Sequence, residues 1–243
     1  MELRGRNALV TGGARRVGRA LTLALAHAGA NVFVHYGRSA ADAEQVVSEV
    51  EACGARAACG SADLSDPDSA PGLIEAATGA LGPISLLLNS ASAFPRDTLA
   101  DVDLDGLRST LDLTLASPVM LTQAFAAALP DGLDGSVVNL TDVHTATPYR
   151  QHLSYTLAKG AVDTFTRAAA VALAPRVRVN AVALGVILPP PGEGDAYAER
   201  LAAGIPLARV GGTDPVAKAV VALLENDFVT GEIIRIDGGG HLR

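Results

Sequence analysis

The 243-residue sequence contains no tryptophan, and aromatic residues make up only 4% of it. Because 49% of the residues are hydrophobic, a large core is expected, built mainly from Ala, Val and Leu. The net charge of −7 gives the chain no general attraction to nucleic acid or to acidic membranes. Gly, Pro or charged residues interrupt the apolar runs, so no transmembrane span is expected either.

Cysteine is equally scarce, and only Cys53 and Cys59 are present. Two thiols without a secretory context predict no disulfide framework, and both are expected to be small buried hydrophobic residues. The N-terminus, Met1–Arg6, lacks the apolar segment of a signal peptide, which predicts a cytoplasmic protein. The five histidines lack metal-ligand spacing, so no metal site is expected. His144 and His152 could line a pocket, although exposed loop positions are the default interpretation.

Strand-like and helix-like stretches alternate along the whole chain, and no linker divides it. Strands are expected at Asn7–Val10, Asn31–His35, Arg56–Ala62, Ile84–Asn89, Ser136–Leu140, Val177–Ala183 and Ile233–Ile236. Helices are expected at Arg19–Ala28, Asp42–Ala52, Leu104–Leu129, His152–Ala174, Ala196–Ala203 and Val216–Asn226. Pro118 should kink the longest helix, and a helix after Asp66 should begin late because of Pro71.

This alternation predicts an α/β fold with a doubly wound parallel sheet, in a single domain of residues 1–243. The half that binds a cofactor is expected in roughly residues 1–100, and the catalytic and substrate half in roughly 101–243.

A glycine-rich turn, Thr11-Gly-Gly-Ala-Arg-Arg-Val-Gly18, follows the first expected strand and precedes a helix. Glycines at this place let the backbone approach a pyrophosphate, which sits on the helix N-terminus. The motif therefore indicates a dinucleotide cofactor, with a plain tight turn as the alternative.

The end of the second expected strand indicates which dinucleotide is bound. An acidic residue there would hydrogen-bond the ribose 2′-hydroxyl of NAD, but His35-Tyr-Gly-Arg-Ser39 contains none. Arg38 offers a guanidinium and Ser39 a hydroxyl to a 2′-phosphate, and Arg15 and Arg16 can approach the same place. We therefore predict NADPH rather than NADH; for any single Arg, a solvated surface charge is the alternative.

An acid, a tyrosine and a lysine are spaced for proton transfer after the fifth expected strand. Asp142 precedes Tyr155 by thirteen residues, and Lys159 follows Tyr155 by four, which places the phenol and the ammonium on one face of a helix. A neighbouring cation favours the phenolate, so this phenol can exchange protons near neutral pH. We predict Asp142, Tyr155 and Lys159 as the catalytic residues; a helix cap is the alternative for Asp142.

The chain resembles the short-chain dehydrogenase/reductase family over essentially its full length. The matching motifs are Thr11-Gly12, Gly18, Asp63-Leu64, Asn89-Ser-Ala-Ser92, Tyr155-x-x-x-Lys159, Arg178-Val-Asn180 and Asp237-Gly-Gly. The resemblance implies a seven-stranded Rossmann-type sheet with helices on both faces, hydride transfer from a nicotinamide cofactor, and a homotetramer.

The resemblance also implies which residues contact the cofactor. They are Thr11, Gly12, Arg15, Arg16, Val17, Tyr36, Arg38, Ser39, Asp63, Leu64, Asn89, Ala91, Ser92, Lys159 and Gly185. Asp63 would hold the adenine and Asn89 would lie beside the ribose. Lys159 would bind the nicotinamide ribose and lower the pKa of Tyr155.

Four residues depart from the usual family pattern. Arg16 and Asp142 replace the usual Gly and Ser, while Thr114 and Leu184 stand where Asn and Pro are common. The first two departures resemble the pteridine reductase branch of the family. Thr114 and Leu184 are not explained by that branch.

The end of the chain strengthens this likeness, because Phe228–Gly231 and Asp237–Arg243 resemble the bacterial dihydromonapterin reductases of the branch. By the same resemblance, Phe94 would stack on the pterin, and Ser92 would contact the pterin or a cofactor phosphate. Core packing is the alternative for Phe94. The stretch Pro189–Gly194 falls where the family carries a lid over the substrate.

The chemistry of the acid favours a C=N substrate over a ketone. A carbonyl reductase needs a neutral donor beside Tyr155, and an ionised Asp142 would repel the developing alkoxide. Reduction of C=N sends a proton to nitrogen, for which an acid coupled to Tyr155 is suited. We therefore predict NADPH-dependent reduction of a 7,8-dihydropterin (dihydromonapterin, dihydrobiopterin or dihydrofolate), with Ser92, Phe94, Asp142 and Tyr155 binding the substrate.

Two other functions stay open. Thr141 or Thr145 could supply the hydroxyl that Ser usually provides, which would allow carbonyl or 3-oxoacyl reduction. A cofactor-binding paralogue without activity is disfavoured, because Tyr155 and Lys159 are both present.

Overall fold

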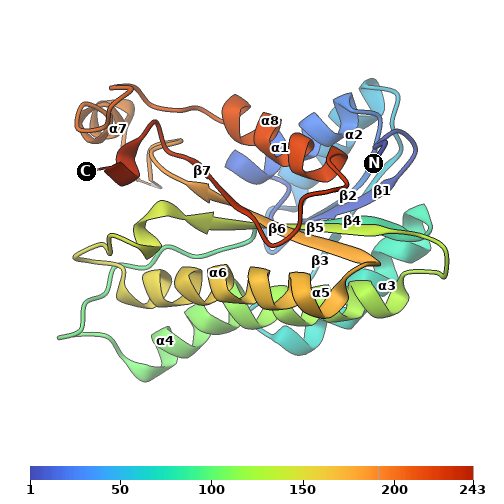
Figure 1. The fold of residues 1–243 in the computed structure, drawn as a ribbon, viewed down its shortest axis with the longest axis horizontal. Helices are drawn as coiled ribbons and strands as arrows, with labels where there is room; N and C mark the ends of the chain where they lie inside the picture. The colour runs from blue at the N-terminus through green and yellow to red at the C-terminus, as the bar shows by residue number, and fades with distance from the viewer. Residues whose placement is uncertain (191, 243) are drawn as a thin grey trace.

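The computed structural model describes residues 1–190 and 192–242. Its centre is a seven-stranded sheet with the order β3-β2-β1-β4-β5-β6-β7 (Figure 1). The strands are β1 Asn7–Val10, β2 Asn31–Tyr36, β3 Ala57–Ser61, β4 Ile84–Asn89, β5 Gly135–Asp142, β6 Val177–Leu184 and β7 Ile233–Ile236. Every adjacent pair is parallel, so the doubly wound α/β fold expected from the sequence is confirmed.

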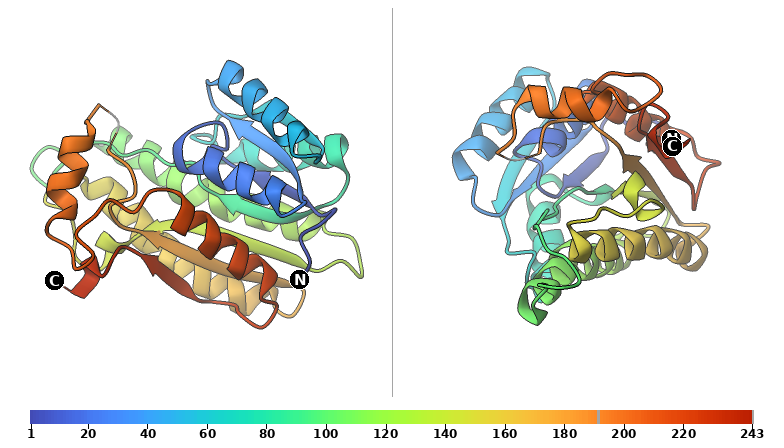
Figure 2. Two further views of the ribbon diagram at one scale, coloured as in Figure 1. Left: turned by 90° about the horizontal axis from the view of Figure 1, so that it is seen from above. Right: turned by 90° about the vertical axis from the view of Figure 1, so that its left-hand side faces the viewer.

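Helices cover both faces of the sheet (Figures 1 and 2). Their bounds are α1 Arg16–His27, α2 Ala40–Ala52, α3 Ala70–Leu81, α4 Leu104–Leu111, α5 Ser117–Ala128, α6 Leu153–Leu173, α7 Asp195–Ala202 and α8 Asp214–Glu225. Side chains of α1, α2 and α8 form the core on one face, and those of α3, α5 and α6 form it on the other. β4 and β5 are buried along their whole length, as expected for parallel strands covered on both faces.

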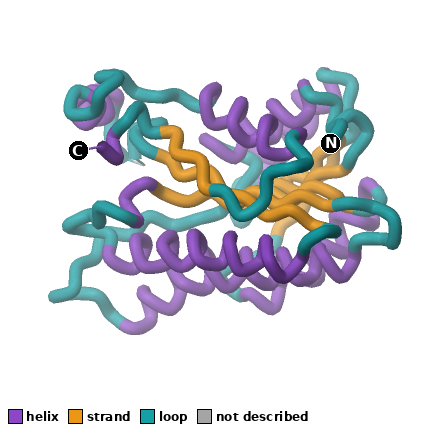
Figure 3. The backbone as a smooth tube through the Cα atoms, in the orientation of Figure 1, coloured by secondary structure: helices purple, strands orange, loops and turns teal. Residues whose placement is uncertain are grey.

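Because every adjacent pair is parallel, the carboxyl ends of the strands lie along one edge of the sheet, which Figure 3 shows between two layers of helices. β1 lies between β2 and β4, so the strand order reverses at β1 and β4. In sheets of this kind, ligands bind beyond the carboxyl ends at the point of reversal. The loops after β1, β2, β4, β5 and β6 leave the sheet at this edge, and they carry most of the expected cofactor and catalytic residues.

The single helix expected at Leu104–Leu129 is divided into two. α4 ends at Leu111, a turn of π geometry follows at Asp112–Ala116, and α5 then begins with Pro118 in its first turn. Proline lacks the N–H that would continue the ladder of hydrogen bonds, so the irregular turn lies before Pro118 rather than as a kink within one helix.

The combined segment Leu104–Ala128 is long and apolar enough to cross a membrane, which the sequence analysis did not expect. Its best window has a mean hydropathy of 1.2. Core helices of globular proteins meet the same criterion, and α5 does place Leu121 and Phe125 in the core beneath the sheet.

The expectation of two buried cysteines is wrong. Cys53 is exposed and Cys59 is half-buried. Cys53 follows the last turn of α2, where its Sγ contacts the carbonyl of Glu49 and the His27 ring. Cys59 lies on β3, the edge strand of the sheet, where cover is thinner.

Candidate active site

The three expected catalytic side chains meet where β5 ends and α6 begins. Tyr155 Oη donates a hydrogen bond of 2.9 Å to Asp142 Oδ2. Lys159 Nζ donates to the carbonyl of Leu140 at 2.6 Å and lies 5.7 Å from the centroid of the Tyr155 ring. All three residues are buried, which strengthens the electrostatic interactions among them.

The Tyr155 phenol is held in its neutral form. Burial and the charge of Asp142 raise its pKa well above the ordinary value. The pKa of Tyr155 is therefore not lowered on balance, contrary to the expectation from Lys159, because the carboxylate accepts directly from Oη whereas the ammonium donates to a backbone carbonyl. Burial lowers the pKa of Lys159 itself to about 8, against the opposing charges of Asp142 and Asp163. Lys159 can therefore release a proton close to neutral pH.

A residue from a distant loop fixes the start of α6. The backbone carbonyl of Asp97 accepts from the N–H of His152 at 2.8 Å, and its carboxylate accepts from the N–H and the hydroxyl of Ser154. His152 adopts a positive φ of 79°, so α6 begins one residue later than expected. These contacts join the loop that carries Phe94 to the helix that carries Tyr155.

Phe94 lies within a cluster of aromatic rings. Its ring stacks on the ring of His152, with centroids 3.7 Å apart and an interplanar angle of 12°. The ring of Tyr155 meets Phe94 edge-on at 4.6 Å. The exposed-loop interpretation of His152 is therefore wrong. The structure places Phe94 next to the Tyr155 phenol, with one face of the Phe94 ring covered by His152.

Asp142 has two further contacts, and the first is a cap, the alternative that the sequence offered for this residue. Its Oδ1 accepts from the N–H of His144 at 2.8 Å and so caps a short 3₁₀ turn, Val143–Thr145, which means that Asp142 is both a cap and a site residue. Tyr149, which the sequence analysis missed, also donates to this carboxylate, at 3.3 Å from Oδ2. No periodic pattern surrounds Tyr149 in the sequence, so the sequence did not indicate its contact with Asp142.

The two threonine hydroxyls that could replace the usual Ser are both occupied. Thr141 Oγ1 donates to Asp163 Oδ1 at 2.6 Å, and Thr145 Oγ1 donates to Asp163 Oδ2 at 2.7 Å. In this arrangement neither hydroxyl proton is free to orient a substrate carbonyl beside Tyr155.

The glycine-rich turn is tightly built against the neighbouring strand ends. Gly12 has a positive φ of 62°, and a Cβ on it would lie 3.2 Å from Ala91 Cα. Thr11 Oγ1 accepts from the N–H groups of Ser90 and Ala91 at 2.9 and 3.0 Å, so this hydroxyl joins β1 to the loop after β4. These contacts shape the turn.

A buried histidine that the sequence analysis missed also supports this turn. His35 Nδ1 accepts from the N–H of Gly12 at 3.1 Å, and its Nε2 lies 3.1 Å from the carbonyl of Ala62. This network assigns the neutral Nε2–H tautomer. Burial lowers the pKa of His35, which favours that neutral form.

The first turn of α1 suits a phosphate group. No side chain caps this helix, and its first turn contains no acidic residue, so its N–H groups and the positive end of its dipole are available to an anion. Arg16 holds a positive φ of 52° at the position where the family usually has Gly. Val17 follows half-buried in the same turn. The turn and helix therefore fit a pyrophosphate.

Of the three arginines expected near a 2′-phosphate, one is free to bind it. Arg15 pairs with Asp42, its Nε lying 2.6 Å from Oδ2, and Arg16 donates to the carbonyl of Pro189. Arg38 is exposed and forms no ion pair within the described part of the chain. With no carboxylate at the end of β2, Arg38 fits a cofactor that carries a 2′-phosphate.

Other expected cofactor residues lie near the carboxyl ends of the strands and differ in exposure. Tyr36 and Ser39 are half-buried after β2, and Leu64 is buried. Asp63 is exposed and accepts from the N–H and the hydroxyl of Ser65. Asn89 is only 4% exposed, and its amide donates to Asn139 at 2.9 Å, so its side chain faces β5 rather than the surface.

The remaining site residues adjoin the loops after β4 and β6. Ser92 is exposed, and its hydroxyl lies 3.4 Å from that of the buried Thr114. This contact connects Thr114, which stands where the family usually has Asn, to the site. A Cβ on Gly185 would lie 2.6 Å from Asp237 Cβ, so Gly185 is required by packing against the chain after β7. In the lid expected at Pro189–Gly194, Pro191 lies outside the described residues.

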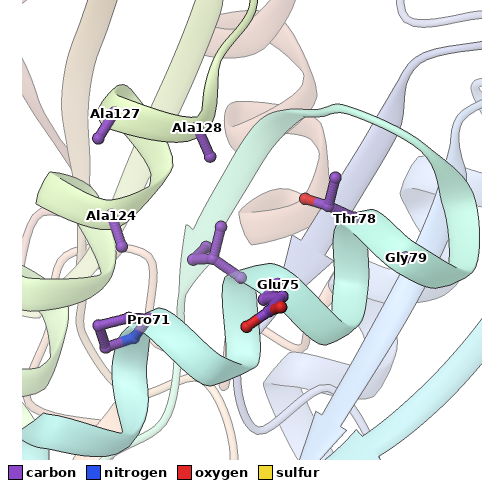
Figure 4. A pocket seen from close by; sticks show the side chains of 8 residues that line it. Pro71, Glu75, Thr78, Gly79, Ala124, Ala127 and Ala128 are labelled. Atoms are coloured by element: carbon purple, nitrogen blue, oxygen red, sulfur yellow. The ribbon is translucent and has the colours of Figure 1, made fainter.

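Two surface hollows lie apart from the catalytic cluster. A hollow of about 660 Å³ is lined by α3 and α5, with Pro71, Glu75 and Ala127 among its walls (Figure 4). A second, of about 430 Å³, lies beside β7 and is lined by Arg209, Arg235 and Asp237 among others. Neither is lined by Asp142, Tyr155 or Lys159.

Comparisons with known proteins agree with the geometry. The family model described as enoyl-(acyl carrier protein) reductase matches residues 12–241. The structure of FolM alternative dihydrofolate reductase 1 from Brucella suis in complex with NADP is 37% identical, with a TM-score of 0.95 over 100% of this chain and 97% of that one. The Brucella canis structure complexed with NADP is also 37% identical, with a TM-score of 0.93 and the same coverage.

A curated relative carries a different activity. The 3-oxoacyl-(acyl-carrier-protein) reductase of Synechocystis sp. is 34% identical over 237 residues, which are 96% of this chain and 95% of that protein. Since the family match spans nearly the whole chain, and the sheet order and the Tyr155–Lys159 pair agree with it, this chain belongs to the short-chain dehydrogenase/reductase family of oxidoreductases.

Proposed function

We propose that this protein is an NADPH-dependent reductase of a 7,8-dihydropterin, a dihydromonapterin-like compound, with dihydrobiopterin and dihydrofolate as related candidates. One observation carries the proposal: the buried carboxylate of Asp142 accepts from the catalytic phenol, where the family usually has Ser. Similarity to two NADP-complexed alternative dihydrofolate reductases supports the same cofactor and substrate class.

The chain supplies the proton half of this reaction. The nicotinamide supplies a hydride when it is bound. The phenol of Tyr155 keeps its proton until the substrate nitrogen takes it, because its pKa is raised by burial and by Asp142. A phenolate beside Asp142 is unfavourable, so Tyr155 regains a proton at once. The nearby donor is Lys159, whose pKa is about 8 and whose Nζ lies 5.7 Å from the centroid of the phenol ring.

The similarity to a 3-oxoacyl reductase favours a second candidate, reduction of a carbonyl. Two observations oppose it. The charge of Asp142 would repel the developing alkoxide, and the hydroxyls of Thr141 and Thr145 both donate to Asp163. A cofactor-binding protein without turnover is the third candidate.

An NADPH-oxidation screen distinguishes these functions. We expect oxidation of NADPH with 7,8-dihydropterins and formation of the tetrahydropterin, with little turnover of simple ketones or 3-oxoacyl thioesters. Turnover of ketones without turnover of dihydropterins would overturn the proposal. Tight NADPH binding with no turnover across the whole panel would indicate the protein without activity.

Cofactor choice can be tested at Arg38, the unpaired arginine after β2. We expect Arg38→Ala to raise the Kd for NADPH roughly 10- to 100-fold, because a charge-assisted bond to the 2′-phosphate is lost, while the Kd for NADH stays unchanged. Fluorescence titration of both cofactors measures this. Arg108→Ala, an exposed arginine on α4, is the matched control. Equal weakening of NADPH and NADH would remove Arg38 from cofactor selection.

We also propose a homotetramer located in the cytoplasm. Leu157 and Val171, which are 51% and 83% exposed, lie four turns apart on α6, and a partner subunit could cover them. Light scattering of the purified protein tests the assembly, and a monomer would contradict it. Cell fractionation tests the location.

A further inference from the structure

The carboxylate of Asp142 is shared by two phenols. Tyr155 Oη is 2.9 Å from Oδ2, while Tyr149 Oη lies between the two oxygens, 3.3 Å from Oδ2 and 3.5 Å from Oδ1. The N–H of His144 donates to Oδ1 from the other direction. A carboxylate that is only 7% exposed has lost most of its hydration, which such donors replace, and Tyr149 is one of three.

Aromatic contacts hold Tyr149 in this position. Its ring lies 4.1 Å from the ring of His144 and meets the rings of Phe94 and His152 edge-on, each at 5.6 Å. Tyr149 is in the loop between the 3₁₀ turn and α6, so these rings, rather than regular backbone structure, fix its hydroxyl on Asp142. Burial and the charge of Asp142 raise the pKa of Tyr149, which makes it a permanent donor.

Other titratable groups lie around Asp142. α6 contributes Tyr155 and Lys159, whose ammonium lies 5.7 Å from the centroid of the phenol ring. It also contributes Asp163, which accepts from the hydroxyls of Thr141 and Thr145. The C-terminal 3₁₀ turn Gly240–Leu242 contacts the turn Val143–Thr145 and carries His241, which is paired with Asp237 at 2.8 Å. His144 completes the set from the loop.

We propose that Tyr149 is a positioning residue for the reaction: its hydroxyl holds the carboxylate of Asp142 in place and keeps Oδ2 directed at Tyr155. This inference rests on the proposed function only where it concerns turnover of a dihydropterin. It assigns a role to the loop before α6, which otherwise carries no reacting group. The alternative is that Tyr149 serves only to pack the loop.

Tyr149→Phe separates these roles, because it keeps the ring and its contacts and removes only the hydroxyl. We expect kcat for dihydropterin reduction to fall about tenfold, with KM and the Kd for NADPH nearly unchanged. Ser48→Ala, which removes an exposed hydroxyl on α2, is the control and should leave kcat and KM unchanged.

A second measurement does not depend on turnover. NMR of isotope-labelled aspartate in the substrate-free enzyme, at one fixed pH, follows the carboxyl carbon of Asp142, identified by the loss of its signal in Asp142→Asn. Tyr149→Phe removes a hydrogen bond to this carboxylate and should change its chemical shift, whereas Ser48→Ala should not. An unchanged signal overturns the role of Tyr149, whatever the substrate proves to be. A changed signal in an enzyme that does not reduce dihydropterins supports Tyr149 and overturns only the proposed function.

Discussion

Asp142→Asn is expected to lower kcat for dihydropterin reduction by roughly 100- to 10,000-fold, the usual contribution of general acid–base catalysis, because Tyr155 loses the charged partner that orients its phenol. The amide keeps an oxygen for the N–H of His144 and so preserves the 3₁₀ turn, but it removes the charge that Tyr149 and Tyr155 donate to. The Kd for NADPH should stay within about twofold, because the phosphate-binding turn contains no part of this cluster. Stopped-flow single turnovers measure the chemical step directly.

Two further variants give this prediction its controls. Asp142→Ser restores the residue that the family usually has, and it should lose dihydropterin reduction while gaining some turnover of ketones. Asp105→Asn removes an exposed acid on α4 and should have no effect. Unchanged dihydropterin turnover in Asp142→Asn would remove the carboxylate from the mechanism.

Gly18→Ala is expected to damage stability and cofactor binding together. A Cβ on Gly18 would lie 2.1 Å from the carbonyl oxygen of Gly12 and 2.8 Å from its carbon. Both atoms are backbone, so the glycine-rich turn must move away from α1. We expect a loss of about 2–3 kcal/mol, a Tm lower by roughly 5–10 °C, and a Kd for NADPH raised more than about tenfold.

The matched control is Gly79→Ala on α3, where an added Cβ meets nothing within 4 Å. This change should raise stability by about 0.5–1 kcal/mol, because glycine is a poor helix former. Thermal unfolding and NADPH titration of both variants make the comparison. A Gly18→Ala protein with ordinary Tm and ordinary NADPH affinity would show that the turn has room that the structure does not indicate.

The sheet was predictable because each strand is a short apolar run bounded by turn residues. Ile84–Asn89 is apolar apart from Ser85 and Asn89, and Val177–Leu184 is apolar apart from Arg178 and Asn180. The pairing of Asp142 with Tyr155 was predictable from the family resemblance, because Asp142 stands where the family usually has Ser. Local pattern was therefore sufficient for the sheet but not for this contact.

What the sequence did not reveal depends on contacts between distant segments. The turn at His152 is held by Asp97, which lies fifty-five residues earlier, and this contact brings His152 onto Phe94. The direction of the Tyr155 pKa also depended on distances, because Lys159 and Asp142 act in opposite senses and only the structure shows that Asp142 is the direct partner. Cys59 is only half-buried because β3 is the edge strand of the sheet, although its neighbours in the sequence are apolar.

The histidine beneath the glycine-rich turn links cofactor binding to proton concentration. His35 accepts from Gly12 only when Nδ1 is unprotonated, and burial holds its pKa below 6.5. The unfolded chain therefore binds more protons than the native one between that lowered pKa and 6.5, so the free energy of unfolding rises with pH across this interval. Near and below the lowered pKa of His35, where the native protein itself carries this proton, a ligand that requires the intact turn must expel it. NADPH binding at such pH values should release protons to the buffer, and calorimetry in buffers of different ionisation enthalpy would detect them. Through His35 on β2, proton binding thereby competes with binding of the dinucleotide.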